Sequence, residues 1–194
     1  MSLILASGSA IRHSLLLAAG VAHHVQPSSV DESPIKSAHD GDDGSLALAL
    51  ASAKASDVSA RLSGNWVIGA DSLVSVDGRR YGKPRDRTEA AAHLAAFSGR
   101  PMILTSAVVL ACNSRIEWQH ADSAILHVRK LSDEFIHNYL GSEWPEVASC
   151  VGVFRMEGRG SQLFDRVEGS HFTVLGLPLL PLLGALRDRD LLPS

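Results

Sequence analysis

Hydrophobic residues recur at every second position in some segments of this chain and at every third or fourth position in others. The first pattern is typical of strands and the second of helices, so strands and helices are predicted to interleave. Strands are predicted over 2–6, 23–27, 66–68, 73–76, 102–112, 116–118, 121–128, 150–156, 163–167 and 171–175. Helices are predicted over 10–19, 45–62, 89–97, 132–140 and 178–186. Because hairpins occur among the strands, the pattern predicts an α/β protein with a mixed sheet and flanking helices.

Cap residues and turn signals predict where these elements end. The predicted N-caps of three helices are Ser9, Thr88 and Ser132, since a hydroxyl can accept a hydrogen bond from an amide in the first turn. Asp77-Gly78 is a dipeptide typical of a two-residue type I′ hairpin, in which both residues need positive φ. The segment 30–44 is polar, and its aspartates lack the spacing of a calcium-binding loop, so it is predicted to be a solvated loop.

The stretch 66–84 combines a buried strand, a carboxylate and a basic loop. Asp71 follows the small residues Gly69 and Ala70, and the loop after the hairpin carries several cations, among them Lys83. A carboxylate at a strand end that faces loop cations suits a site for an anionic substrate and a metal. The alternative is a scaffold role, since an aspartate between strands is often a turn former and a basic loop is usually a solvated face.

Arg12 lies in the first turn of its predicted helix, where the helix dipole disfavours a cation. A bound phosphate would make the helix amides and Arg12 act together. We prefer this interpretation to the alternative in which Arg12 points sideways into solvent. Lys54 is the only cation between residues 45 and 60, and it becomes relevant to a site if its helix lies beside Asp71.

Composition narrows the class of protein. The chain has 194 residues, enough for one domain or a tight pair of lobes, and its net charge of −3 argues against broad nucleic-acid binding. No apolar run approaches a membrane span and no signal-peptide pattern begins the chain, so no membrane partner is expected. Cys112 and Cys150 are predicted to be packed as small hydrophobic residues, and so few cysteines fit a reducing cytoplasm.

Segments along nearly the whole chain resemble the Maf-type nucleotide pyrophosphatases in order and spacing. They are Leu5-Ala-Ser-Gly-Ser9 with Arg12, Asp31-Glu32, Lys54-Ala55, Gly69-Ala-Asp71, Asp77-Gly78, Gly82-Lys-Pro84, Ser98-Gly99, Glu157-Gly-Arg-Gly160, Glu168-Gly169 and Gly176-Leu-Pro-Leu179. The resemblance implies a single domain over 1–194, with an elongated mixed sheet, a fold shared with inosine-triphosphate pyrophosphatases, and two lobes around a deep central cleft. It also implies hydrolysis of a nucleoside triphosphate to the monophosphate and pyrophosphate, Mg²⁺ or Mn²⁺ as cofactor, a cytoplasmic location and a homodimer.

The resemblance assigns roles to particular residues. The residues expected to bind phosphate are Ser7, Ser9, Arg12, Lys54 and Lys83. Asp71 is implied to be the catalytic proton acceptor, and Glu32 and Asp71 are the candidates for holding the metal or the water. A free carboxylate is a weak base at neutral pH, and a metal that acidifies the attacking water would compensate. The sequence leaves open whether Asp71 acts as base or as metal ligand.

Three positions look responsible for base choice in this family, and here they are Ile11, Ser72 and Glu157. The branch that acts on dTTP and UTP shows Arg, Thr and Gln there, whereas the branch that acts on 7-methyl-GTP shows Glu at the third. Glu157 favours 7-methyl-GTP, since a carboxylate can accept from guanine N1–H and N2–H₂ and tolerates a cationic methylated ring. Ile11 and Ser72 match neither branch cleanly. A dTTP/UTP pyrophosphatase and a nucleotide-binding regulator of cell division with little catalysis are the alternatives.

Overall fold

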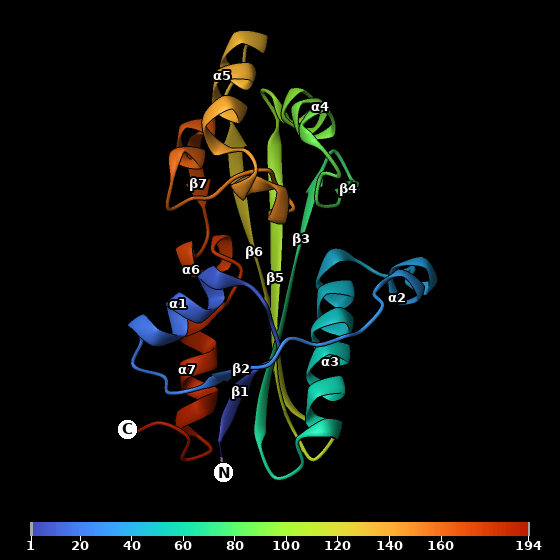
Figure 1. Ribbon diagram of the computed structural model, residues 1–194, viewed down its shortest axis with the longest axis vertical. Helices are drawn as coiled ribbons and strands as arrows, with labels where there is room; N and C mark the ends of the chain where they lie inside the picture. The colour runs from blue at the N-terminus through green and yellow to red at the C-terminus, as the bar shows by residue number, and fades with distance from the viewer. Residues whose placement is uncertain (1, 194) are drawn as a thin grey trace. The chain divides into compact units, whose positions relative to one another are not determined.

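The computed structural model describes residues 2–193, which form a mixed seven-stranded sheet with helices packed against it (Figure 1). The strands are β1 (Leu3–Leu5), β2 (His24–Val25), β3 (Trp66–Val76), β4 (Arg79–Tyr81), β5 (Pro101–Cys112), β6 (Arg115–Val128) and β7 (Phe164–Glu168). The helices are α1 (Ala10–Ala18), α2 (Ser33–Ala38), α3 (Asp43–Arg61), α4 (Arg87–Phe97), α5 (Asp133–Glu143), α6 (His171–Val174) and α7 (Leu179–Arg187), with 3-10 turns η1 (Glu146–Ser149) and η2 (Arg159–Leu163).

Six of the seven strands follow one another across the sheet in the order β2-β1-β3-β5-β6-β7. The seventh, β4, lies outside this order and pairs with β3. β1 pairs in parallel with both β2 and β3, whereas the β3–β4 and β6–β7 pairs are antiparallel. The prediction of an α/β protein with a mixed sheet is therefore confirmed. The predicted strands 116–118 and 121–128 are one continuous strand, β6.

The described chain divides into two compact units. The first contains the residues up to 72, 105–122 and those from 175 onward, and the second contains 73–104 and 123–174. Helices α1, α2, α3 and α7 belong to the first unit, while α4, α5 and α6 belong to the second. Strands β3, β5 and β6 each contribute residues to both units.

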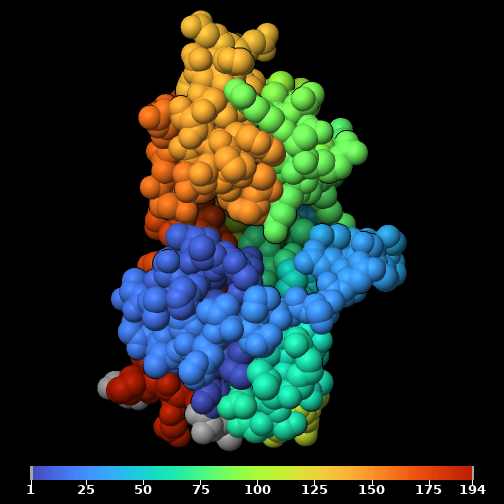
Figure 2. All heavy atoms as spheres, viewed as in Figure 1, coloured from blue at the N-terminus to red at the C-terminus, as the bar shows by residue number. Residues whose placement is uncertain are grey.

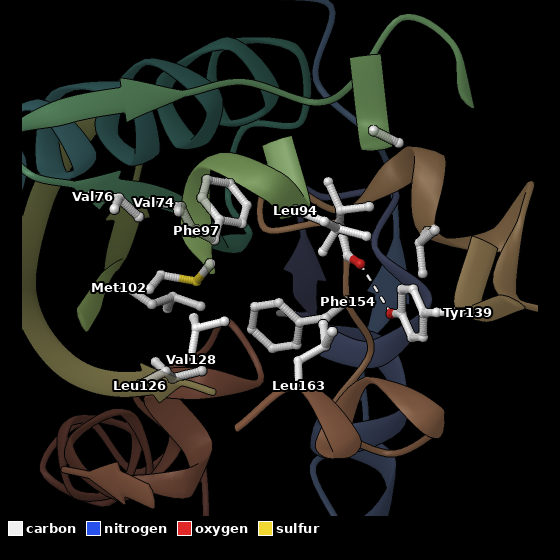
Figure 3. Close-up of a cluster of buried hydrophobic side chains, with 14 of the residues drawn as sticks. Val74, Val76, Leu94, Phe97, Met102, Leu126, Val128, Tyr139, Phe154 and Leu163 are labelled. Carbon is white, nitrogen blue, oxygen red and sulfur yellow. Dashed lines mark hydrogen bonds between the residues drawn. The ribbon is translucent and has the colours of Figure 1, made fainter. Parts of the chain in front are cut away.

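The second unit is built on a cluster of buried apolar side chains (Figure 3). Phe97 from α4 and Met102 from β5 are almost completely buried in it, as is Leu126 from β6. Tyr139 from α5 also lies in the cluster, and its hydroxyl donates to the carbonyl oxygen of Val153 at 2.9 Å. The polar atom of this buried tyrosine is thereby satisfied, which avoids the cost of burying an unpaired hydroxyl.

Two short strands predicted in this unit are wrong. Residues 150–156 form turns, and Val153 has a φ of 57°, which is incompatible with a strand. Val153 and Phe154 are buried in the core, which accounts for the apolar run, but they do not pair with a neighbouring strand. Residues 171–174 form the short helix α6. An apolar run of this length does not distinguish a buried strand from a buried helical turn.

The predicted solvated loop 30–44 is also partly wrong, because it contains helix α2 and the start of α3. Pro34 lies in the first turn of α2, where a missing N–H costs nothing, and no residue of α2 is buried. Figure 2 shows α2 as an exposed projection beside α3. A helix that buries no side chain leaves no apolar periodicity in the sequence, so the pattern did not reveal it.

The turn and cap predictions have mixed outcomes. The Asp77-Gly78 hairpin is confirmed, with φ of 50° and 75°. Ser132 caps α5 as predicted, its hydroxyl accepting from the amide of Phe135 at 3.1 Å. The prediction of Thr88 for α4 is wrong, because Asp86 caps this helix and accepts from the amide of Glu89 at 2.8 Å.

Candidate active site

The first unit brings α3 close to β3 at Gly69. A Cβ at this position would lie 2.2 Å from the carbonyl oxygen of Ala51 and 2.8 Å from Cβ of Ala55, so a glycine is required for the two elements to pack. Residues i and i+2 of a strand face the same side, and Asp71 therefore faces α3 as well. Lys54 precedes Ala55 on α3, and this packing places its side chain beside Asp71.

The ammonium group of Lys54 bridges two carboxylates that come from distant parts of the sequence. Its Nζ donates a hydrogen bond to Oδ1 of Asp71 in an ion pair, and it lies 2.7 Å from Oε1 of Glu32. The other oxygen of Glu32, Oε2, lies 2.5 Å from Nζ of Lys36 on α2. The Lys54 and Asp71 side chains are 14% and 11% exposed, so their ion pair is mostly shielded from water. The structure thus assembles Glu32, Lys54 and Asp71 at one point.

Lys36 is a member of this cluster that the sequence analysis missed. Its spacing of four residues from Glu32 was the available signal, because residues at i and i+4 are neighbours on a helix. Partial burial opposes ionisation of Glu32, but the hydrogen bonds from Lys36 and Lys54 outweigh it and lower the pKa of Glu32 to about 2. Glu32 is therefore negatively charged throughout the neutral range.

Arg12 points into the protein and is only 9% exposed. Its Nε donates to the carbonyl oxygen of Gly176 at 2.8 Å. Its Nη1 donates to Ser7 Oγ at 3.1 Å and to the carbonyl oxygen of Ala70 at 3.0 Å. Its Nη2 donates to Ser72 Oγ at 3.0 Å. The alternative in which Arg12 points sideways into solvent is therefore wrong, and phosphate binding by Arg12 stays a prediction.

The charge of Arg12 belongs to the same electrostatic neighbourhood as the two carboxylates. Burial lowers the pKa of the Arg12 guanidinium, while the charges of Asp71 and Glu32 act in the opposite direction. An arginine remains protonated under such a shift because its ordinary pKa is so high. Arg12 therefore adds a fixed positive charge to a site that holds two carboxylates and Lys54.

The two serines before α1 differ from their predicted arrangement. Ser9 is at the N-cap position of α1, but its hydroxyl makes no capping hydrogen bond, so that part of the prediction is wrong. Instead, Ser7 Oγ accepts from the amide of Ser9 at 3.3 Å and from Arg12. The Ser7 hydroxyl is thus used to fix the turn and the guanidinium. Phosphate binding by Ser7 and Ser9 stays a prediction.

Lys83 and Glu157 belong to the second unit, and both are exposed. Both act electrostatically on Cys150: burial is the main factor that raises the pKa of its thiol, Glu157 adds to the rise and Lys83 opposes it. The Glu157 loop is held at Arg155, whose Nη2 lies 3.0 Å from Oε2 of the buried Glu143. Phosphate binding by Lys83 and base selection by Glu157 stay predictions.

The donor set at Lys54 fits a divalent cation as well as an ammonium group. Glu32 Oε1 and Asp71 Oδ1 converge on a single positive atom. Carboxylate oxygens are the ligands that Mg²⁺ and Mn²⁺ prefer, and Mg²⁺ is commonly held by one or two carboxylates together with substrate phosphates. Glu32 and Asp71 are therefore the residues of this cluster that could hold the predicted metal.

Comparison with known proteins gives concordant results over nearly the whole chain. A family model described as Maf-like protein matches residues 2–189. A protein of Rhizobium meliloti named 7-methyl-GTP pyrophosphatase is 46% identical over 189 residues, which cover 96% of this chain and 95% of the relative. A protein of Nitrobacter winogradskyi named nucleoside triphosphate pyrophosphatase is 42% identical and covers 98% of this chain and 95% of its own length.

Another relative with the name 7-methyl-GTP pyrophosphatase comes from Rhizobium etli and is 43% identical, covering 96% of this chain and 95% of its own length. A solved nucleoside-triphosphatase (dITP/XTP pyrophosphatase) from Mycobacterium abscessus covers 66% of this chain and 73% of its own, at 18% identity and a TM-score of 0.40. So distant a likeness does not inform the fold or the site.

No helix among residues 2–193 is both long and apolar enough to cross a membrane.

Proposed function

This chain belongs to the Maf-like family, and we propose that it hydrolyses 7-methyl-GTP to 7-methyl-GMP and pyrophosphate. The broader activity, hydrolysis of a phosphoanhydride bond in a nucleoside triphosphate, is supported by relatives of both names at 42–46% identity. The observation that carries the proposal is the meeting of Glu32, Lys54 and Asp71 at one point, close to the buried Arg12. Opposite charges gathered in this way suit a polyanionic substrate that binds together with a cation.

In the proposed reaction a water molecule attacks the α-phosphorus, and the bond from that phosphorus to the bridging oxygen of the pyrophosphate breaks. Lys54 engages Oδ1 of Asp71, so we assign Oδ2 as the atom that accepts the proton from the water. Lys54 also orients this carboxylate, which would otherwise rotate. Arg12 supplies positive charge for the phosphate oxygens in this proposal, and the same role for Lys83 stays a prediction from the sequence.

Mg²⁺ or Mn²⁺ is the proposed cofactor, held by Glu32 and Asp71. When bound, it would supply positive charge that neutralises the triphosphate and makes the attacking water easier to deprotonate. The chain's own contribution is to aim both carboxylates at one point and to keep Glu32 ionised. The hydrogen bonds of Lys36 and Lys54 do this for Glu32, because they lower its pKa to about 2 against the opposing effect of burial.

The methylated base is assigned from Glu157 and from the names of two relatives. A carboxylate can accept hydrogen bonds from the Watson–Crick edge of guanine and is attracted to a ring that carries a positive charge. Glu157 is exposed in the second unit and is therefore available to a ligand.

A homodimer and a cytoplasmic location remain part of the proposal, and sedimentation of the purified protein tests the former.

The test is pyrophosphate release from a panel of nucleotides with Mg²⁺ or Mn²⁺ present. The panel contains 7-methyl-GTP, GTP, UTP and dTTP, and Asp71→Asn serves as the inactive reference. We expect the highest kcat/KM for 7-methyl-GTP, by roughly tenfold or more over GTP. A preference for dTTP or UTP would replace this substrate with the alternative one. Release of no pyrophosphate from any nucleotide would overturn the enzymatic function itself.

A further inference from the structure

A buried serine of β5 contacts Arg12 indirectly, through the side chain of Ser72. Ser106 is 0% exposed, and its Oγ lies 2.8 Å from Oγ of Ser72 on β3. Ser72 Oγ in turn accepts from Nη2 of Arg12 at 3.0 Å. Two hydroxyls therefore connect the interior of the first unit to the guanidinium, in the order Ser106, Ser72, Arg12.

The geometry around Ser72 shows why Ser106 matters to it. A hydroxyl has one hydrogen and two lone pairs, so Ser72 can accept from Arg12 and still form one or two further hydrogen bonds. Its other neighbour is the carbonyl oxygen of Gly176, at 3.4 Å, and that oxygen already accepts from Arg12 Nε at 2.8 Å. Ser106 is thus the closer partner, and in either direction of their hydrogen bond it fixes the rotamer in which Ser72 Oγ accepts from Nη2.

The nitrogen held by Ser72 is also the one that remains available for substrate. Within residues 2–193, Nε and both hydrogens of Nη1 have acceptors, namely Gly176, Ser7 and Ala70. Nη2 donates to Ser72 and retains a second N–H without an acceptor in that part of the chain. Because the guanidinium is planar, the bonds of Nε and Nη1 set its plane, and the hydrogen bond to Ser72 adds a restraint at Nη2 itself, the nitrogen whose remaining N–H a phosphate oxygen can accept.

We propose that Ser106 is a positioning residue for the reaction: it holds Ser72, and through Ser72 it orients the free N–H of Arg12 for a phosphate oxygen. This inference rests on the proposed function, because it assigns Arg12 to the triphosphate. It adds a residue to the site that contacts neither the nucleotide nor the reacting atoms. Its effect is on how well the guanidinium is preorganised.

The first experiment compares two buried serines of the same unit. Ser59 is 1% exposed and accepts from the amide of Ser114 at 2.9 Å, so Ser59→Ala also removes a buried hydroxyl with a partner. For Ser106→Ala we expect kcat to fall by about tenfold with KM changed by less than about threefold. Ser59→Ala should lower the melting temperature similarly and leave kcat unchanged. Equal losses of kcat in the two variants, or an unchanged kcat in Ser106→Ala, would overturn the proposal.

A double-mutant cycle tests the route through Ser72. Positioning through Ser72 requires that Ser106→Ala has little further effect on kcat once Ser72 is already alanine. Multiplicative losses in Ser72→Ala/Ser106→Ala would show that Ser106 acts by another route and would overturn the proposal. Ser106→Thr retains the hydroxyl, and recovery of kcat to within about threefold of the wild type is expected from it.

A readout without catalysis separates this inference from the proposed function. In ¹H–¹⁵N NMR spectra we expect the Nη protons of Arg12 to give separate, slowly exchanging signals in the wild type and in Ser59→Ala. Ser106→Ala should shift and broaden the Nη2 signals selectively, because Nη2 loses part of its restraint while Nε and Nη1 keep their acceptors. If the wild type hydrolyses no nucleotide, the proposed function fails while these spectra still decide the positioning of Arg12. Identical Arg12 signals in wild type and Ser106→Ala would overturn it.

Discussion

Oε1 of Glu32 lies 2.7 Å from Nζ of Lys54, and this ammonium group is bonded at the same time to Asp71. Lys54 therefore holds together two carboxylates from separate segments, one before α2 and one on β3. Because these three side chains form ion pairs that are mostly shielded from water, a change at any of them alters the electrostatic balance of the others.

Asp71→Asn should reduce kcat for pyrophosphate release by at least roughly 100-fold, because an amide cannot accept the proton from the attacking water. Nucleotide binding should survive, since the amide oxygen can still accept from Lys54. Equilibrium binding and steady-state turnover measure the two effects separately. Asp57→Asn is the matched control, as Asp57 lies on the same helix as Lys54 and pairs with Arg61 at 2.7 Å. Wild-type turnover in Asp71→Asn would remove Asp71 from the chemistry.

Lys54→Met should strengthen Mn²⁺ binding in the absence of nucleotide by about tenfold, while lowering kcat/KM for the triphosphate. Methionine keeps much of the side-chain volume but removes the cation that neutralises Glu32 and Asp71. Electron paramagnetic resonance of free Mn²⁺ measures the affinity. Lys36→Met is the control, because Lys36 contacts the other oxygen of Glu32 and its side chain is 48% exposed, so a smaller change is expected. Weaker Mn²⁺ binding in Lys54→Met would contradict the assignment of both carboxylates to the metal.

Gly69→Ala should destabilise the protein by about 1–3 kcal/mol and also lower activity. The added methyl group would meet the backbone of Ala51 at 2.2 Å, and α3 must shift to accept it, taking Lys54 with it. Urea unfolding measures the free energy of unfolding. Gly184→Ala in α7 meets nothing within 4 Å and should stabilise by up to about 1 kcal/mol, since alanine favours a helix over glycine. A neutral Gly69→Ala would mean that α3 packs less closely than described.

His93→Phe should reduce the loss of stability on acidification. Burial lowers the pKa of His93 below its ordinary value of 6.5, with Glu89 opposing and Arg79 assisting the shift. The unfolded chain therefore takes up the proton first, so stability is full above about pH 6.5 and falls as the pH drops toward the lowered value. Phenylalanine cannot be protonated and also replaces the buried Nδ1, which has no hydrogen-bond partner in residues 2–193.

Melting temperatures between about pH 7.5 and pH 5 measure this difference, and the His93→Phe curve should be flatter than the wild-type curve. The ring contacts of His93 with Tyr81 and Phe97, at centroid distances of 5.1 and 5.9 Å, remain available to phenylalanine. His137→Gln changes an exposed histidine of α5 and should leave the wild-type slope unchanged. Parallel curves for wild type and His93→Phe would show that His93 does not contribute to the pH dependence.

Glu157→Gln should lower kcat/KM for 7-methyl-GTP by about tenfold and for UTP by less than about threefold. The amide still accepts a hydrogen bond at its oxygen, but it loses the attraction to the cationic base and places an N–H group against the donors of guanine. Glu134→Gln, an exposed glutamate in the same unit, is the control and should change neither value. Equal losses for both nucleotides would remove Glu157 from base selection.

The sequence by itself determined the features that depend on neighbouring residues. The Asp77-Gly78 hairpin and the Ser132 cap follow from interactions within a few residues, and both are present as predicted. The long strand 102–112 was also evident, since it coincides with β5 to within one residue. β3 and β6 were each predicted as two separate strands, and Asp71 therefore lies within β3 and not at a strand end. The order and spacing of motifs along the chain indicated the family, and the family match over residues 2–189 agrees.

The tertiary structure decided what depends on residues far apart in the chain. Whether the apolar residues at 150–156 formed a strand depended on their partners, and Val153 accepts from Tyr139 instead of pairing with a strand. The inward direction of Arg12 depended on Gly176, which is 164 residues away, and no periodicity carries that information. The hydrogen bond between Ser106 and Ser72 was likewise not predictable, because nothing in the sequence around a serine in an apolar strand indicates which side chain of another strand will lie next to it. Local propensity is encoded in neighbouring side chains, whereas these contacts exist only once the chain has closed on itself.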